Sequence, residues 1–517
     1  MESTGTPTPA PLQPLGYETV HPDALLGTDR LLADLGGHSA RGGALMIASD
    51  TFQLVLGFVS TFVLARILVP GDFGLVAMVG SIMAFVATMR DFGLPMATVQ
   101  KPNLTHIQLS NLFWLNLKLA ALVAILLTGL APAIAWFYRQ PQLTAITWVM
   151  TVGVFAVGMS TIHMGLLRRQ MRFRAITAIE SCGAAAGVAV AIPAAMMGAG
   201  YWALVLQQVT ASVATGAALW AVSRWRPGPP QRNGDDPEMR SMLSYGKYLT
   251  GSRAVNYVGK NLDVVLIGKF AGAAPAGLYQ KAEQWAGLTF WQVYSPLSDV
   301  LVASFSRLQQ DPERYRAYFR KSVMGLYFIT APAMAFACVG ANEIILLLLG
   351  PKWAAAVPIF RVMAIGALAG SVLHVAKWIY LAEGSTKRQL SWSLIATPVL
   401  VGGVIAGLHW GAIGVACGYT VASCMLALPG LRYALKGSPL HVSDFASAVW
   451  RPTLAALLAA VALFGLQRGA PEIQPLIVRF IRDFCFISVV YLVLWVLMPG
   501  GWRSLRELLN LLRHLRA

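Results

Sequence analysis

Residues 143–197 read LTAITWVMTVGVFAVGMSTIHM, then GLLRRQMRFR, then AITAIESCGAAAGVAVAIPAAMM. A helix needs about 20 apolar residues to cross a bilayer, and both outer runs meet that length. The short segment between them carries Arg168, Arg169, Arg172 and Arg174. Such a segment is too short to bury a core, and lysine and arginine concentrate in loops on the inner side of a membrane. The stretch therefore predicts two membrane helices joined on the inner side.

The composition extends this reading to the whole chain. Of its 517 residues, 56% are hydrophobic and only 12% are charged, whereas a soluble domain carries about 25% charged residues. We expect an all-α polytopic membrane protein, because a transmembrane barrel would show alternating segments of about ten residues. The net charge of +17 would suggest nucleic acid for a soluble protein. Here basic inner loops account for it, and no nucleic-acid partner is expected.

Residues that support catalysis or metal binding do not cluster in the sequence. The five cysteines form an odd, scattered set without a CxxC motif or paired histidines, which argues against a disulfide framework and a metal site. We also find no nucleotide-binding loop and no nucleophile–base pair. The sequence therefore predicts no cofactor, no metal and no enzymatic activity.

Hydropathy and helix-breaking residues predict fourteen spans, near residues 44–66, 72–94, 112–136, 144–166, 175–197, 202–223, 247–268, 283–305, 322–349, 354–382, 390–409, 411–430, 453–467 and 475–498. The run 322–349 is a span that could carry a re-entrant end. The expected organisation is a largely disordered cytoplasmic tail (1–43), an N-lobe of helices 1–6 (44–224), a cytoplasmic linker (225–246), a C-lobe of helices 7–12 (247–433), helices 13–14 (447–498) and an interfacial amphipathic helix (500–517).

The distribution of lysine and arginine orients these spans. With the N-terminus inside, the inner segments hold 27 of the 40 basic residues and the outer loops hold 8. The remaining five lie within spans. This asymmetry places both termini in the cytoplasm.

Three short matches indicate an internal repeat. GLLRRQ (165–170) is similar to GSTKRQ (384–389), GDFGLV (71–76) to APAGLY (274–279), and GAGYWA (198–203) to GAIGVA (411–416). The matches keep their order, and each lies at the equivalent junction between spans. Helices 1–6 and 7–12 are therefore expected to form two pseudo-symmetric six-helix lobes in parallel orientation, with two extra helices.

The chain resembles a known family in this plan. IGKF…GLYQKAEQW after span 7, FSRLQQDPERYRAYFRK after span 8 and LLGPKWAAAVPIFRVMA before span 10 are similar to the polysaccharide transporters. These are Wzx-type flippases of the multidrug/oligosaccharidyl-lipid/polysaccharide exporter superfamily. The resemblance implies a central cavity and movement of undecaprenyl-diphosphate-linked oligosaccharide to the outer leaflet of the bacterial inner membrane, for exopolysaccharide, capsule or O-antigen synthesis. It also implies a polysaccharide polymerase and a chain-length regulator as partners.

Span 7 offers the candidate lining of such a cavity. Arg253, Asn256, Lys260 and Asp263 follow one another at i, i+3, i+7 and i+10, which places them on one helical face. Arg253 and Lys260 are about 10 Å apart along the axis, a spacing that suits a diphosphate. The alternative is that Lys260 and Asp263 form a structural ion pair while Arg253 extends toward the inner interface.

Other charged residues within the spans are weaker candidates. Arg361, near the outer end of span 10, is a possible contact for the emerging head group, and Lys118 and Lys377 either line the cavity or extend toward the inner interface. Asp50 and Glu180 are candidates for coupling to a cation or for structural pairing at helix starts. Trp285, Trp291, Tyr294, Trp378 and Tyr380 either stack on sugars or form an interfacial belt.

Two other functions remain open at this level. A cation-coupled multidrug-type exporter would share the plan but favours acidic residues within the spans, whereas basic residues are as prominent here. A polysaccharide polymerase or ligase would need a large outer loop with catalytic groups, and the predicted outer loops are short.

The orientation can be tested with reporter fusions. We expect fusions after residues 230 and 312 to report the cytoplasm and fusions at 140 and 200 to report the outside, because the basic loops stay inside. A consistent reversal in a paired alkaline phosphatase and fluorescent protein assay would refute the charge count.

Overall fold

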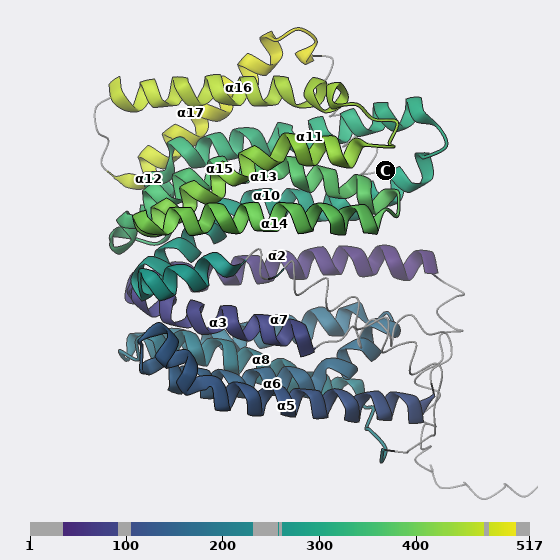
Figure 1. Ribbon diagram of the computed structural model, residues 1–517, viewed down its shortest axis with the longest axis vertical. Coiled ribbons are helices and arrows are strands. Elements are labelled where there is room, and N and C mark those ends of the chain that lie inside the picture. The colour runs from purple at the N-terminus through teal and green to yellow at the C-terminus, as the bar shows by residue number, and fades with distance from the viewer. Residues whose placement is uncertain (1–34, 91–104, 231–256, 258–260, 470–474, 503–517) are drawn as a thin grey trace, which may run out of the picture.

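The computed structural model describes residues 35–90, 105–230, 257, 261–469 and 475–502, and every regular element among them is a helix (Figure 1). The first half contains α2 (Leu35–Ile67), α3 (Pro70–Arg90), α5 (His106–Tyr138), α6 (Gln142–Arg169), α7 (Phe173–Met196) and α8 (Tyr201–Ser223). The second half contains the helical residues 261–270, α10 (Ala273–Leu308), α11 (Pro312–Val339), α12 (Ala341–Leu348), η2 (Pro351–Ala356), α13 (Val357–Ala382), α14 (Thr386–Gly407), η3 (Leu408–Trp410), α15 (Gly411–Leu435), α16 (Val442–Gly469) and α17 (Leu476–Leu497). The predicted all-α membrane fold is confirmed.

The described helices are built for a bilayer. Nine stretches are long and apolar enough to cross it, and one of them, Lys387–Leu435, contains both α14 and α15. The run 322–349 is divided between the end of α11 and the short helix α12, and the re-entrant character of its end stays a prediction. The count of fourteen stays a prediction, because part of the seventh span lies outside the described residues.

The helices form two groups (Figure 1). In the N-terminal group α5 packs on α6 and α7 on α8, and in the C-terminal group α13 and α14 both pack on α15. Helix α16 packs on α11, and α17 packs on α16, so the last two helices cover the C-terminal group on the side away from the N-terminal one. We call the two groups the N-lobe and the C-lobe.

The repeat is present, but one sequence match is out of register. GLLRRQ lies at the end of α6, whereas GSTKRQ contains a turn and the start of α14. The turns themselves correspond at an offset of 213, since Met171 (φ 52°) and Gly384 (φ 67°) both adopt the left-handed conformation. GAGYWA and GAIGVA share this offset. The two arginine-rich strings therefore lie near the same turn of each copy, but they do not occupy equivalent positions. The turns are built from different residues, Met171 in one copy and Gly384 in the other.

The two lobes meet where α3 crosses α10. A Cβ atom on Gly74 would overlap the carbonyl of Ala273, and a Cβ on Gly277 would overlap the carbonyl of Pro70 and the amide of Gly74. These two glycines are the matching positions of GDFGLV and APAGLY. Small residues let membrane helices approach backbone to backbone, so the repeat places its glycines where the two copies touch.

Among the described residues, the two lobes share a hydrophobic core near one end, and Tyr257 of span 7 extends the contact along α3 to Ser81 and Phe85. The largest cluster combines residues of both lobes, among them Phe73 and Met78 of α3, Trp285 of α10 and Trp353 of η2. At the other end, the N-lobe has separate clusters around Phe113 and around Leu167, made only of N-lobe residues and Trp225. The core around Phe305 belongs to the C-lobe and its last two helices. We call the joined end the closed end and the opposite end the open end.

The glycine contact makes a stability prediction. We expect G277A to lower the free energy of unfolding by about 1–3 kcal/mol, because the added methyl group must push α3 and α10 apart. G80A is the matched control, since a Cβ at Gly80 has no heavy atom within 4 Å. Thermal melting of the purified protein in detergent measures both. Equal melting of the two variants would contradict the close approach.

Candidate functional site

Helix α10 presents one continuous face to the N-lobe. Residues at steps of three or four lie on the same side of a helix, and such steps connect Ala273, Gly277, Lys281, Gln284, Leu288, Trp291, Gln292 and Ser295. At the closed end this face contacts the N-lobe through Gly277, through Lys281 over the ring of Phe73, and through Trp285, whose ring centroid is 4.7 Å from that of Phe58.

Toward the open end the same face is exposed. Gln284, Trp291, Gln292 and Ser295 are all exposed. Because α10 carries these polar residues, it is not among the stretches that qualify as membrane-spanning by hydropathy. Polar residues at membrane depth face the protein interior or water rather than lipid. We call these four residues the open face of α10.

The closed end is held by hydrogen bonds that cross between the lobes. Arg66, at the end of α2, donates from Nη2 to the carbonyl of Leu347 (2.8 Å) and from Nη1 to that of Leu348 (3.3 Å), at the end of α12. Lys352 donates from Nζ to the carbonyls of Ile67 (2.9 Å) and Arg66 (3.2 Å). Each lobe thus supplies a cation to the unpaired C-terminal carbonyls of a helix in the other lobe.

Trp353 completes this contact. Its side chain is fully buried, and its Nε1 donates to the carbonyl of Ala65 at 2.9 Å. We call Arg66, Lys352 and Trp353 the interlobe clamp. Helix α12 is also held by α17, because Arg479 of α17 lies 3.0 Å from the Glu343 carboxylate of α12.

Lys281 is a site residue that the sequence reasoning missed. It was counted with an outer loop, two residues before the predicted span, but it lies inside α10 and is only 9% exposed. Its ammonium donates to Gln284 Oε1 at 2.8 Å and lies 4.9 Å from the Phe73 ring centroid. No carboxylate among the described residues forms an ion pair with it. The sequence could have indicated this position, because the helical pattern of 273–308 begins before the apolar run and includes Lys281.

Span 7 is described only in part. Arg253, Asn256 and Lys260 lie outside the described residues, so their lining role stays a prediction. Tyr257 donates to the carbonyl of Ser81 in α3 at 2.9 Å. Asp263 is 5% exposed and accepts hydrogen bonds from the Tyr279 hydroxyl (2.6 Å) and the Val264 amide (2.7 Å), which joins the described end of span 7 to α10.

The other predicted basic residues occupy separate places. Arg361 is exposed near the start of α13, at the closed end, and its Nε donates to the carbonyl of Cys338 at 3.0 Å. Lys118 is exposed on α5. Lys377 is exposed on α13, one turn beyond His374, which contacts Trp291 of the open face. Lys377 thus lies one turn from a contact between α13 and α10, and the structure does not bring the three basic residues together.

The two predicted acids lie in the N-lobe. Asp50 is part of α2, but its side chain lies outside the described part of the structure. Glu180 is half-buried in α7. The neighbouring Ser181 hydroxyl lies 3.1 Å from that of Ser49, so the two acids lie on adjacent helices.

A pocket of about 670 Å³ lies at the closed end. It is lined by Trp136 and Arg139 from the end of α5 and by Lys269 from the C-lobe, and Lys269 donates to the carbonyl of Phe137. Arg139 and Lys269 were both assigned to outer loops by the charge count. The two cations therefore belong to one pocket with contributions from both lobes.

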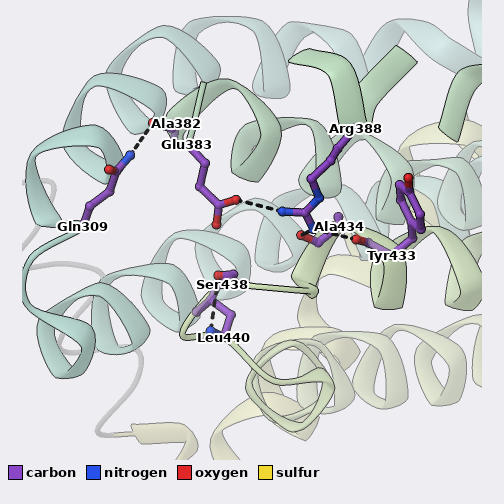
Figure 2. Close-up of polar contacts among 8 residues, drawn as sticks. All are labelled: Gln309, Ala382, Glu383, Arg388, Tyr433, Ala434, Ser438 and Leu440. Carbon is purple, nitrogen blue, oxygen red and sulfur yellow. Dashed lines mark hydrogen bonds and ion pairs between the residues drawn. The ribbon is translucent and has the colours of Figure 1, made fainter. Parts of the chain in front are cut away.

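At the open end, Arg388 ties the helix ends of the C-lobe together (Figure 2). Its Nη2 donates to the carbonyls of Tyr433 (2.9 Å) and Ala434 (3.1 Å) in the last turn of α15, and its Nη1 lies 3.4 Å from Glu383 Oε2. Burial raises the pKa of the Glu383 carboxyl, while the Arg388 guanidinium acts in the opposite direction. In the N-lobe, Arg172 approaches the carbonyl of Val222 at the end of α8 (3.4 Å). The arginines of the predicted inner loops thus bind the carbonyls of helix ends.

The sequence matches a known family and is similar to characterised proteins. The family described as polysaccharide biosynthesis protein matches residues 63–358, more than half of the chain. The succinoglycan biosynthesis transport protein ExoT of Rhizobium meliloti is 27% identical over 90% of this chain and 94% of its own. The lipopolysaccharide biosynthesis protein WzxC of Escherichia coli K12 is 24% identical over 82% of this chain and 87% of its own.

Solved structures share the fold at low sequence identity. The lipid II flippase MurJ in an inward closed conformation superimposes with a TM-score of 0.70 at 13% identity, covering 87% of this chain and 98% of its own. An inward-facing multidrug MATE transporter superimposes with a TM-score of 0.60 at 13% identity, covering 74% and 94%. The chain therefore belongs to the polysaccharide biosynthesis protein family and is a multi-pass membrane protein with the helical fold of these transporters.

Proposed function

We propose that the protein moves a polyprenyl-diphosphate-linked oligosaccharide from the inner to the outer leaflet of the bacterial inner membrane. The movement occurs by alternating access through a cationic cavity between the lobes, with both termini in the cytoplasm. The relatives support this substrate class, because one is named as a transport protein of succinoglycan biosynthesis. The fold neighbour MurJ is named as a flippase of lipid II.

The observation that carries the proposal is the changing environment along one face of α10. This face is packed against α3 at the closed end, whereas Gln284, Trp291, Gln292 and Ser295 farther along it are exposed. We infer that the lobes, whose described residues share a core near the closed end, enclose a cavity that opens at the other end. The charge count assigns that end to the cytoplasm, where the lipid-linked precursor is expected to enter.

A cavity of this kind solves a physical problem. Moving an unpaired hydroxyl into an apolar medium costs roughly 2–7 kcal/mol, so an oligosaccharide head group cannot cross bare lipid at a useful rate. A wet interlobe path removes that cost while the polyprenyl tail stays in lipid. An inside-negative potential also favours outward movement of the diphosphate, by about 2.3 kcal/mol per charge and 100 mV.

Basic side chains along the path bind the diphosphate of the substrate. Arg253 and Lys260 are proposed to receive it in the cavity, and Lys281 to receive it as the closed end opens. Lys281 supports this order, since it is buried and its ammonium lies over the ring of Phe73 in the other lobe, so that separation of α3 and α10 would expose it. A buried cation is costly in a membrane, and no carboxylate in the described part of the chain pairs with Lys281, which favours a functional role for it.

The two other functions fit less well. A multidrug-type exporter shares the fold, but the family match and the names of the relatives concern polysaccharides. A polymerase or ligase is disfavoured because ExoT is named as a transport protein.

Substitution of the span 7 cations tests the proposal. We expect R253A and K260A to abolish surface polysaccharide while the amount of protein in the membrane is unchanged, because a methyl group cannot pair with a phosphate. R253E and K260E should be more severe, and R253K should keep partial function, since it retains the charge but loses the bidentate fork. Polysaccharide staining and immunoblotting measure these outcomes.

The structural alternative has its own signature. If K260A disappears from the membrane and K260A/D263A restores it, Lys260 forms an ion pair with Asp263 and does not bind substrate. Accumulation of lipid-linked oligosaccharide on the inner leaflet in the R253A strain supports transport. Its absence, together with normal surface polysaccharide, would rule out the assignment of Arg253.

Alternating access predicts that the interlobe clamp is broken in part of the cycle. We expect K352M to shift the equilibrium toward a state with a separated closed end, because the carbonyls of Arg66 and Ile67 lose their cross-lobe donor. Spin labels at Met197 and Trp410, exposed and repeat-equivalent positions of the two lobes, report the distance by electron double resonance in a cysteine-free background. K352M should increase the long-distance population, whereas the control K118M should not. Identical distributions would contradict the clamp.

A further inference from the structure

Five aromatic rings form a continuous cluster between α10 and α13: Phe290, Trp291, Tyr294, His374 and Trp378. Tyr294 stacks on Trp378 with a centroid distance of 5.2 Å and an interplanar angle of 2°, and its hydroxyl donates to the carbonyl of His374 at 3.0 Å. Trp291 contacts Tyr294 edge-on (5.5 Å, 87°) and His374 (4.7 Å, 68°). The cluster therefore holds the Trp291 indole in place from the C-lobe side.

Trp291 differs from its neighbours in exposure. Phe290, Tyr294 and Trp378 are buried, whereas Trp291 is 41% exposed. It lies on the open face of α10, about 27 Å along the helix from Ala273 at 1.5 Å per residue, near the middle of a 36-residue helix. Tryptophans of an interfacial belt lie at the membrane surface and face lipid. Trp291 instead lies on the face that packs against the N-lobe at the closed end.

Exposed polar side chains lie near Trp291 in the sequence of α10. Gln292 and Ser295 are exposed on the same face of α10, and Lys377 is exposed one turn beyond His374. A pyranose ring has a flat face of C–H bonds and a rim of hydroxyl groups. The electron-rich face of an indole attracts such C–H groups, an amide and a hydroxyl can bond the rim, and binding sites for polar ligands combine aromatic walls with a few such groups.

We propose that Trp291 is the stacking platform for a pyranose ring of the transported head group. Gln292 and Ser295 bond its hydroxyls, and Lys377 lies on the side of the diphosphate. This inference deepens the proposed function and rests on it. It makes Trp291 a binding residue for the sugar and not for the lipid carrier, so loss of the indole should affect only ligands that carry a sugar.

Equilibrium binding with two probes tests this separation. The probes are undecaprenyl diphosphate and the lipid-linked oligosaccharide extracted from host membranes that lack the protein. We expect W291A to weaken binding of the oligosaccharide lipid by about three- to tenfold and to leave undecaprenyl diphosphate binding unchanged. W291F should retain most of the affinity and W291L, which fills space without a π face, should not. W450A is the matched control, since Trp450 is 43% exposed on the distant helix α16.

The outcomes separate the two proposals. If W291A and W291L bind both probes as the wild type does, or weaken both equally, Trp291 does not recognise sugar and the inference is overturned while the proposed function stands. If the wild type binds neither probe, the proposed function fails and the inference with it. Should W291A not reach the membrane, the contrast between W291F and W291L decides.

Discussion

The contact between α3 and α10 is the constraint on which the rest of the structure depends. Two helices approach backbone to backbone only if small residues stand at the crossing, and the chain supplies Gly74 and Gly277 there. The crossing brings Lys281 against Phe73 and joins the cores of the two lobes. Since α10 is much longer than the contact, the rest of its face is left exposed toward the open end. One close approach thus creates both a closed end and an open face.

Five basic residues of the closed end make specific contacts in the structure. Arg66, Arg139, Lys269, Lys281 and Lys352 are few compared with the basic residues of the predicted inner loops. In the structure they cap helices of the opposite lobe, line a shared pocket or are buried at the lobe contact. A cation that hydrogen-bonds carbonyls of the other lobe stabilises the arrangement of the lobes in this structure. Under the proposed alternating access, these hydrogen bonds would break and re-form in each transport cycle.

The last two helices stabilise the element that carries half of the clamp. Helix α12 is short and ends in carbonyls that accept from Arg66, and its Glu343 pairs with Arg479 of α17. A buried carboxylate needs a partner, so α17 holds α12 in position from the side away from the N-lobe. Within the described part of the chain, this contact gives α17 a structural role.

The sequence by itself determined the fold class and the repeat, because apolar runs of bilayer length and helix-breaking residues act locally. It also indicated the family, through the order of its motifs, and the glycines at equivalent places. The register of the arginine-rich match was wrong, because a turn built on Met171 and one built on Gly384 look different in sequence and alike in backbone conformation. The charged residues of span 7 were recognised from spacing, and their role stays a prediction.

Only the tertiary structure decided which face of α10 meets the other lobe, and with it the meaning of Lys281 and Trp291. Helical spacing shows that residues share a face but not what that face contacts, since that depends on a helix more than two hundred residues earlier in the chain. Lys281 read as a loop charge and Trp291 as one aromatic among several. The lobe contact buries Lys281 and leaves Trp291 exposed. This difference depends on the place where α3 and α10 diverge, and a local sequence pattern does not specify that place.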